Sequence, residues 1–224
     1  MREQLGSRLP EFTVDDFAVL RAAETDFYGM NYYTSQFARH RDTPAAATDY
    51  MGNVDELQQD KAGTPVGEES GLHWLRSCPG MFRKHLTRVY SLYGKPIYVT
   101  ENGCPCPGED KMTRDEAVDD PFRIRYFDTH LDAICKSIKE DGSDIKGYFA
   151  WSLLDNLGKH SLTPTEARYP GQVGLTSNAE WSDGYGPRFG VTFTDYNTLE
   201  RTPKKSALLL KNMFAQRQGI KVAA

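Results

Sequence analysis

Three segments of the sequence place amide, acidic and aromatic side chains within a few positions of one another. They are Asn31-Tyr32-Tyr33, Thr100-Glu101-Asn102-Gly103, and the stretch that contains Trp151, Asp155 and Asn156. Glu101 is the side chain best suited to chemistry, because a carboxylate beside a chain-turning Asn-Gly pair can be presented as a nucleophile. Such a carboxylate can attack the anomeric carbon of a sugar while a second carboxyl group protonates the departing oxygen. Glu-Asn-Gly alone is more often a simple turn.

Two helix–strand pairs lead up to the second and third of these segments. The helices are marked by apolar residues at helical spacing: Phe82, Leu86, Val89 and Tyr93 in the first, and Phe127, Leu131, Ile134 and Ile138 in the second. Gly94 predicts the end of the first helix, and Asp119-Asp120-Pro121 the start of the second. Residues 96–100 and 147–154 are apolar runs that predict buried strands after each helix. Polar groups at the carboxyl ends of such parallel strands are well placed for catalysis.

The remaining segments add one further strand of the same kind. Residues 27–33 predict a strand ahead of the first helix, and residues 191–196 a short strand followed by a last helix from Pro203. Residues 41–71 predict a long irregular loop, and the charges at 109–111 and 115–116 a solvated surface. The fold class is therefore α/β with parallel strands. Three strands of this type are too few to close an eight-stranded barrel, so the barrel is incomplete as given.

Composition and charge exclude several classes of protein. The 27 basic and 31 acidic residues give a net charge of −4, which argues against a nucleic-acid partner. No apolar run is long enough for a membrane span, and the first residues lack the apolar core of a signal peptide, so a cytoplasmic location is expected. The four cysteines (Cys78, Cys104, Cys106 and Cys135) lack zinc-site spacing and are expected to be free thiols. The scattered histidines predict no metal site.

Four motifs resemble glycoside hydrolase family 1, the β-glucosidases. They are residues 26–35 (DFYGMNYYTS), 98–103 (YVTENG), 147–156 (GYFAWSLLDN) and 180–190 (EWSDGYGPRFG), in the order that the family has them. Residues 8–12 and 201–206 are similar to the family as well, so the resemblance covers nearly the whole chain and is of a fungal type. It implies that residues 1–224 are the C-terminal part of a (β/α)8 TIM barrel, about strands 6–8.

The resemblance assigns roles to six residues and implies no cofactor or metal. Glu101 matches the family's catalytic nucleophile, and Asn31 and Tyr33 match the groups beside it, the tyrosine hydroxyl holding the carboxylate. Trp151 matches the residue under the sugar at the reaction centre. Glu180 matches a carboxylate that binds two sugar hydroxyls, and Trp181 its hydrogen-bonding neighbour. Because strand residues alternate, we expect only one of Tyr32 and Tyr33 to face the site.

The sequence departs from the family pattern in two places. The family's general acid lies in an Asn-Glu-Pro motif, and no asparagine of this chain is followed by glutamate. Residues 158–179, a run of 22, separate two motifs that the family joins almost directly, and they have no helical or strand period. This atypical insertion is either an intron retained in the coding sequence, since Gly158-Lys159 fits a GTAAG donor, or a real loop. A spliced transcript that keeps these codons would exclude the intron.

Two functions remain open from the sequence. The first is a hydrolase that cleaves β-glucosidic or related bonds of a small-molecule β-glycoside with retention of configuration. The second is a non-catalytic remnant or truncated product that lacks the acid half. In both cases the chain as written is expected to be inactive alone, because a retaining mechanism needs two carboxyl groups about 5 to 5.5 Å apart.

Overall fold

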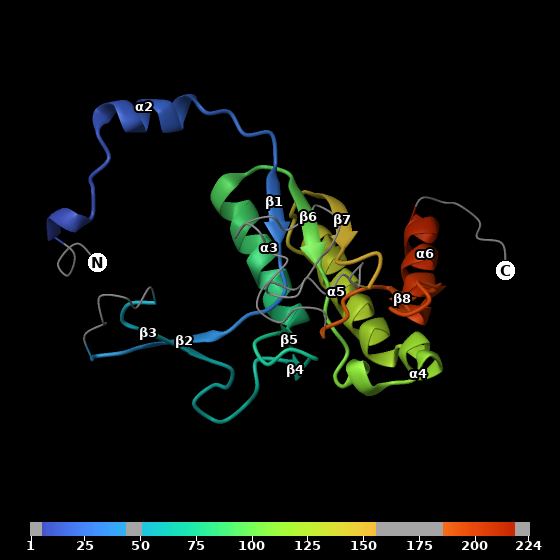
Figure 1. Ribbon diagram of the computed structural model, residues 1–224. Helices are drawn as coiled ribbons and strands as arrows, with labels where there is room; N and C mark the ends of the chain where they lie inside the picture. The colour runs from blue at the N-terminus through green and yellow to red at the C-terminus, as the bar shows by residue number, and fades with distance from the viewer. Residues whose placement is uncertain (1–5, 44–50, 156–185, 218–224) are drawn as a thin grey trace, which may run out of the picture.

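The computed structural model describes residues 6–43, 51–155 and 186–217 (Figure 1). Its centre is a parallel sheet of three strands, β1 (Tyr28–Asn31), β6 (Ile97–Asn102) and β7 (Ile145–Ala150), in the order β1-β6-β7. Helix α3 (Pro79–Tyr93) lies between β1 and β6 in the chain, and α5 (Pro121–Lys139) between β6 and β7. The strands predicted at residues 27–33 and 147–154 end earlier than expected, at Asn31 and Ala150. Trp151 therefore lies directly after β7 rather than within it.

Helices α3 and α5 form where their apolar periodicity predicts them. Phe82, Leu86 and Val89 of α3 are buried, and Gly94 ends the helix in the left-handed conformation with a φ of 59°. The Gly94 N–H donates to the Tyr90 carbonyl at 2.8 Å, which satisfies a carbonyl at the helix end. Pro121 opens α5 at its first position, where a missing N–H costs nothing.

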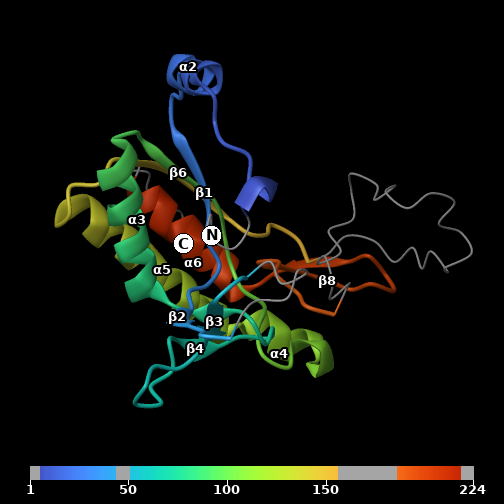
Figure 2. The same ribbon diagram turned by 90° about the vertical axis from the view of Figure 1, so that its left-hand side faces the viewer.

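One face of the sheet packs against these two helices. Figure 2 shows α3 and α5 on the same side of β1 and β6. The core between the sheet and the helices includes Met30, Ile97 and Val99 from the strands and Phe82, Leu86, Phe127, Leu131 and Ile134 from the helices. Tyr28 of β1 also stacks on Tyr93 of α3, with ring centroids 5.5 Å apart. This burial provides the main apolar stabilisation of the described structure.

The opposite face of the sheet carries a second set of side chains, which we call the open face. It comprises Phe27, Gly29, Tyr98, Thr100, Gly147 and Phe149. The Phe27 and Tyr98 rings meet edge to face at 5.0 Å, and a Cβ on Gly147 would lie 2.5 Å from the Tyr98 ring. Phe27 and Phe149 nevertheless remain 48% and 59% exposed. The sheet is therefore covered on one side and largely bare on the other.

The prediction of an irregular loop over residues 41–71 is wrong where two hairpin-like pairs form. Strand β2 (Phe37–His40) pairs antiparallel with β3 (Val54–Leu57), and β4 (Glu68–Glu69) pairs with β5 (Arg76–Ser77). Arg39 of β2 bonds Asp55 of β3 at 2.9 Å across the pair. These short strands are held by polar and charged side chains, so the sequence has no apolar alternation to mark them.

Several short elements were also absent from the sequence-based prediction. Helix α2 (Val14–Ala22) and helix α4 (Arg114–Asp119) each begin with a capping box, Thr13 with Asp16 and Thr113 with Glu116. Two further short elements are the 3₁₀ helices η1 (Gly6–Arg8) and η2 (Glu109–Lys111). Strand β9 (Arg201–Pro203) was not predicted either, whereas the strand it pairs with antiparallel, β8 (Thr192–Thr194), and the last helix, α6 (Lys205–Arg217), form within the segments that the sequence predicts. Among the described helices none is long and apolar enough to cross a membrane.

Candidate functional site

The register between β1 and β6 determines where the Glu101 side chain lies. Met30 pairs with Val99, but Asn31 pairs with Glu101, so the register shifts by one residue at the end of the strands. In a regular strand Glu101 would share the face of Ile97 and Val99, which is buried against the helices. A shift of one residue moves a side chain to the other face, and such irregularities often direct side chains near active sites. Glu101 is accordingly half-buried beside Asn31.

Tyr33 fixes the orientation of the Glu101 carboxylate. Its hydroxyl donates to Oε2 of Glu101 at 2.6 Å, and its ring meets Phe189 edge to face at 6.0 Å. Tyr32, one residue earlier, is buried and stacks on Phe82 at 4.5 Å, and burial raises its pKa. One tyrosine therefore faces Glu101 and the other belongs to the core, as the alternation along the strand predicts.

Asn31 lies at the exposed rim of the same strand end. Its side-chain oxygen accepts a hydrogen bond from the Thr100 hydroxyl at 2.6 Å. This bond uses the amide oxygen, so the amide nitrogen is the donor that Asn31 can offer to a ligand. Asn31, Tyr33 and Glu101 are thus brought together by the pairing of β1 with β6, although their catalytic and binding roles remain predictions.

Asn102, which the sequence analysis treated only as part of a chain-turning Asn-Gly pair, joins the strand ends next to Glu101. Its side chain is completely buried and donates to the Tyr32 carbonyl and the Tyr126 hydroxyl, each at 2.8 Å. It also accepts a hydrogen bond from the Tyr148 hydroxyl at 2.8 Å. One amide therefore joins the ends of β1, β6 and β7 to helix α5. A lone asparagine at the end of an apolar strand is the sequence signal that points to such a role.

Trp151 is held beside Glu101 through the backbone. Its N–H donates to the Asn102 carbonyl at 2.8 Å, and the bond between Trp151 and Ser152 is a cis peptide. Gly103 packs so closely here that a Cβ would lie 1.7 Å from the Trp151 carbonyl oxygen. A glycine is therefore required after Glu101-Asn102 for the two strand ends to approach. The Trp151 ring is half-buried against the core.

Residues 186–194 return to the site beside Trp151. Ser152 N–H donates to the Phe189 carbonyl at 3.2 Å, and Val191 N–H to the Ser152 carbonyl at 2.9 Å. Gly190 is a second close approach, since its Cβ would lie 2.0 Å from the backbone nitrogen of Asp155. Glu180, Trp181, Asn156 and the insertion at 158–179 lie outside the described residues.

A buried set of ion pairs, which we call the charge network, ties this returning segment to the loop after β6. It has three carboxylates and three cations: Glu109, Asp120 and Asp155 with Arg123, Arg188 and Lys204. Lys204 Nζ bonds Glu109 at 2.6 Å and Asp155 at 2.9 Å, and Arg188 bonds Asp155 at 2.8 Å. Because the charges balance, the network is neutral where it is buried.

Arg123 is the centre of the charge network. Its side chain is fully buried and donates to Asp120 at 2.8 Å, to the Cys104 carbonyl at 2.9 Å, and to Glu109 and the Arg188 carbonyl. Burial acts to raise the pKa of Glu109, but Arg123 and Lys204 outweigh it and hold that pKa below its ordinary value. The prediction that residues 109–111 form solvated surface charge is wrong for Glu109, which is 4% exposed.

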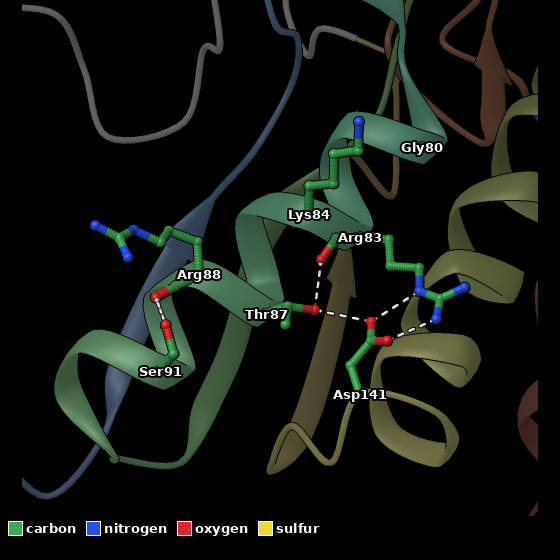
Figure 3. A pocket seen from close by; sticks show the side chains of 7 residues that line it. All are labelled: Gly80, Arg83, Lys84, Thr87, Arg88, Ser91 and Asp141. Atoms are coloured by element: carbon green, nitrogen blue, oxygen red, sulfur yellow. Dashed lines mark hydrogen bonds and ion pairs between the residues drawn. The ribbon is translucent and has the colours of Figure 1, made fainter.

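A hollow of about 620 Å³ on α3 is an alternative place for a ligand (Figure 3). Its polar groups are largely bonded to one another. Arg83 donates to Asp141 at 2.7 and 2.6 Å, and the Thr87 hydroxyl donates to the same carboxylate at 2.9 Å. In Figure 3 Lys84 and Arg88 point away from this group. These contacts tie α3 to the turn after α5, and they present no set of groups directed at one ligand.

No metal site is indicated in the part of the chain that the structure describes. It contains no cluster of three or more His, Cys, Asp or Glu residues able to hold an ion. The four cysteines are free, which agrees with their sequence spacing. The arrangement is that of a sheet with a carboxylate, a phenol, an amide and an indole at its carboxyl end. This class of site is typical of enzymes built on parallel β/α units.

Comparisons with known proteins establish the family. Glycosyl hydrolase family 1 matches residues 1–170, and the chain belongs to that family. Beta-glucosidase 1B of Phanerodontia chrysosporium is 38% identical over 96% of this chain and 35% of its own length. Raucaffricine-O-beta-D-glucosidase of Rauvolfia serpentina is 36% identical over 96% of this chain and 36% of its own length.

Solved structures of this family have the same fold. Beta-glucosidase 2 of Trichoderma reesei, in complex with Tris, matches with a TM-score of 0.80 and 42% identity over all of this chain and 43% of its own. The Humicola insolens GH1 beta-glucosidase, in complex with glucose, has a TM-score of 0.80 and 39% identity. The chain therefore spans about two fifths of the proteins that it matches. Its fold is an incomplete (β/α)8 barrel, as the sequence predicts.

Proposed function

We propose that this chain supplies the nucleophile-bearing part of a retaining β-glucosidase, with Glu101 as the nucleophile. The position of Glu101 carries the proposal: it lies at the carboxyl end of β6 with Tyr33 bonded to one carboxylate oxygen at 2.6 Å. A carboxylate in this place is anchored by its strand and oriented by a phenol, which is the arrangement that attack on a sugar carbon requires.

The proposed reaction breaks the bond between the sugar carbon and the leaving oxygen and forms an ester between that carbon and Glu101. The leaving oxygen takes a proton from a general acid, and water then hydrolyses the ester so that the sugar leaves with its original configuration. No Asn-Glu pair exists in this chain, so the matching acid is not supplied by residues 1–224. The substrate class, a β-glucoside, is inferred from the names of the relatives.

The other candidate residues would bind the sugar rather than react with it. Trp151 would lie beneath the sugar ring, and Asn31 would donate its amide nitrogen to a sugar hydroxyl. Glu180 and Trp181 would bind the far side of the same sugar, as the family resemblance implies. The pairing of Asn31 with Glu101 and the bond from the Trp151 N–H to the Asn102 carbonyl support this assignment for Asn31 and Trp151.

A pair of substrates tests the proposal. A dinitrophenyl β-glucoside needs little protonation of its leaving group, whereas an alkyl β-glucoside depends on a general acid that is worth about 10² to 10⁴ in rate. We expect the chain alone to be inactive on the alkyl glucoside. If the chain holds Glu101 in place, the dinitrophenyl glucoside should give a burst of phenolate that Glu101→Gln abolishes.

The second candidate function, a non-catalytic remnant, is favoured by the missing acid motif. It predicts no burst with either substrate and no difference between the natural chain and Glu101→Gln. Steady hydrolysis of the alkyl glucoside by monomeric chain would contradict both proposals, because each requires the acid to be absent.

A further inference from the structure

The charge network is a large group of buried titratable side chains that the proposed reaction does not use. Its members Arg123 and Lys204 are fully buried, and Glu109 and Asp120 are nearly so. Buried ion pairs are weak evidence for stability, because apolar residues of similar volume often stabilise a core equally well. A guanidinium adds direction instead, since it donates along fixed lines to several acceptors at once. The network should therefore matter most for the segments whose relative position it determines.

One guanidinium joins the segment that carries Glu101 to the segment that carries Phe189. The Nε of Arg123 donates to the Cys104 carbonyl at 2.9 Å, three residues after Glu101. The Nη2 of the same side chain donates to the carbonyl of Arg188, which directly precedes Phe189. Both bonds come from one rigid planar group, so together they fix the spacing between the two segments.

The rest of the charge network holds this connection in place. Asp120 accepts a hydrogen bond from Arg123 at 2.8 Å, and Glu109 accepts from both of its terminal nitrogens. The side chain of Arg188 donates to Asp155 at 2.8 Å. These bonds have a charge at both ends, which makes them stronger than neutral hydrogen bonds. Rotation of Arg123 would break several of them, so the two carbonyls that it binds are firmly held.

Phe189 transmits the position of its segment to the Glu101 carboxylate. Its ring is 1% exposed and meets the Tyr33 ring edge to face at 6.0 Å. Because Phe189 lies outside the described strands, its place beside Tyr33 depends on the contacts of its neighbours. The Tyr33 hydroxyl in turn donates to Glu101 at 2.6 Å. We propose that Arg123 is a positioning residue that keeps Tyr33 aligned with Glu101.

This proposal rests on the proposed function, because it concerns the attack by Glu101. It predicts that loosening Arg123 slows the attack itself, beyond any effect on stability. A displacement of about 1 Å can slow a positioned reaction by about 10²-fold. Arg123→Lys is the most informative variant, since lysine keeps the positive charge but lacks the planar fork that binds two carbonyls and two carboxylates.

The experiment measures a single attack by Glu101. The full chain is fused behind the portion of Beta-glucosidase 1B that precedes its matching segment, and it is mixed with a saturating dinitrophenyl 2-deoxy-2-fluoro-β-glucoside. Each active molecule then releases one phenolate, because the fluorine slows hydrolysis of the sugar ester. The amplitude of the release counts the folded molecules, whereas its first-order rate constant measures the attack alone.

Arg123→Lys should lower this rate constant by about five- to tenfold. In a Tyr33→Phe background the aligned hydrogen bond is already absent, so the same change should lower it by less than about twofold. Arg83→Lys is the matched control, because Arg83 donates two hydrogen bonds to Asp141 outside the charge network. We expect it to leave the rate constant unchanged in both backgrounds.

A merely structural role for Arg123 predicts a smaller amplitude with an unchanged rate constant, and that result would overturn the proposal. Equal slowing in both Tyr33 backgrounds would also overturn it, because the effect would then not depend on the Tyr33 hydroxyl. If Arg123→Lys gives no folded fusion, Arg188→Lys takes its place under the same criteria, since the Arg188 side chain is 13% exposed and tolerates change better.

Failure of the proposed function has a different result. The folded fusion without substitutions would then release no phenolate, or the sugar would be attached to a residue other than Glu101. Either result contradicts Glu101 as the nucleophile, and the positioning role of Arg123 falls with it. Normal labelling of Glu101 together with an unchanged rate constant in Arg123→Lys contradicts the positioning role alone.

Discussion

The charge network and the Glu101 site lie at the same end of the sheet, but they differ in how far this chain completes them. The network balances three carboxylates with three cations, all from described residues and nearly all fully buried. The site has Glu101, the proposed nucleophile, and the supporting Tyr33, but the sequence has no Asn-Glu pair to match the family's general acid. The charge network is thus complete within the described residues, whereas the proposed site still needs an acid.

The largest effect is expected from breaking the charge network at Lys204. Lys204→Met removes the cation that Glu109 and Asp155 share, leaving their charges buried without it. Loss of one partner from a buried pair costs about 3 to 5 kcal/mol, which we expect in the free energy of unfolding measured by urea titration. Lys205→Met is the control, because Lys205 is 60% exposed and pairs with Asp119 at the surface. Its effect should stay below about 1 kcal/mol.

His130 is a buried histidine with only one of its two ring nitrogens bonded, and it predicts a pH dependence. Nδ1 bonds the Tyr126 carbonyl at 2.8 Å, while Nε2 is buried with no partner among the described residues. Burial lowers the pKa of His130 from 6.5 to about 4, so the unfolded chain binds the proton more readily. Stability should therefore fall as the pH drops from about 6.5 to about 4, by up to about 3 kcal/mol.

His130→Phe tests this dependence. Phenylalanine keeps a ring against Tyr126 and Phe82 but cannot be protonated, so this part of the pH dependence should disappear. Urea unfolding at pH 7 and pH 4.5 measures the difference. If the variant loses as much unfolding free energy between pH 7 and pH 4.5 as the natural chain, other groups cause the loss of stability in acid.

Asn102 lies next to Glu101 in the sequence and bonds the segment after β1, helix α5 and strand β7. Asn102→Ala leaves two hydroxyls and a carbonyl without their partner, and we expect a loss of about 2 to 3 kcal/mol in unfolding free energy. Tyr148→Phe removes only one of the three bonds and should cost about 1 kcal/mol. Equal losses in the two variants would show that the Tyr148 bond dominates the cluster.

Tyr33 and its neighbour Tyr32 allow the site and the core to be compared at adjacent positions. In this chain fused behind the portion of Beta-glucosidase 1B that precedes its matching segment, Tyr33→Phe removes the hydroxyl that holds Glu101 and should lower kcat by about ten- to thirtyfold, with little effect on stability. Tyr32→Phe should do the reverse, because Tyr32 bonds Ser35 and the Cys78 carbonyl inside the core. Steady-state kinetics and urea unfolding of both variants distinguish the two positions.

The elements with strong apolar periodicity could be predicted from the sequence. Helices α3 and α5 and the strands beside them follow from stripes that end at Gly94 and begin at Pro121. The pairing of β2 with β3 could not, since its stabilising contact joins Arg39 to Asp55 across a gap that sequence spacing does not reveal. Local charge patterns are a weak guide where distant partners decide burial.

The site shows the same division. Glu101, Tyr33, Asn31 and Trp151 were found from motifs at strand ends, and the register shift that turns Glu101 toward Asn31 was not foreseen. Glu109 was misread because its cations, Arg123 and Lys204, lie 14 and 95 residues further along the chain. The bonding role of Asn102 was not predicted because its three partners, Tyr32, Tyr126 and Tyr148, are far from it in the sequence. Long-range contacts of this kind are specified by the fold as a whole.

The most direct test of the account is covalent labelling of the nucleophile. A dinitrophenyl 2-deoxy-2-fluoro-β-glucoside, added to this chain fused behind the portion of Beta-glucosidase 1B that precedes its matching segment, should form a stable sugar ester, because the fluorine slows its hydrolysis. Peptide mass spectrometry should find the sugar on Glu101 alone, and a folded Glu101→Gln fusion should remain unlabelled. Labelling of any other carboxylate, or of the Glu101→Gln variant to the same extent, would contradict the assignment of Glu101 as the nucleophile.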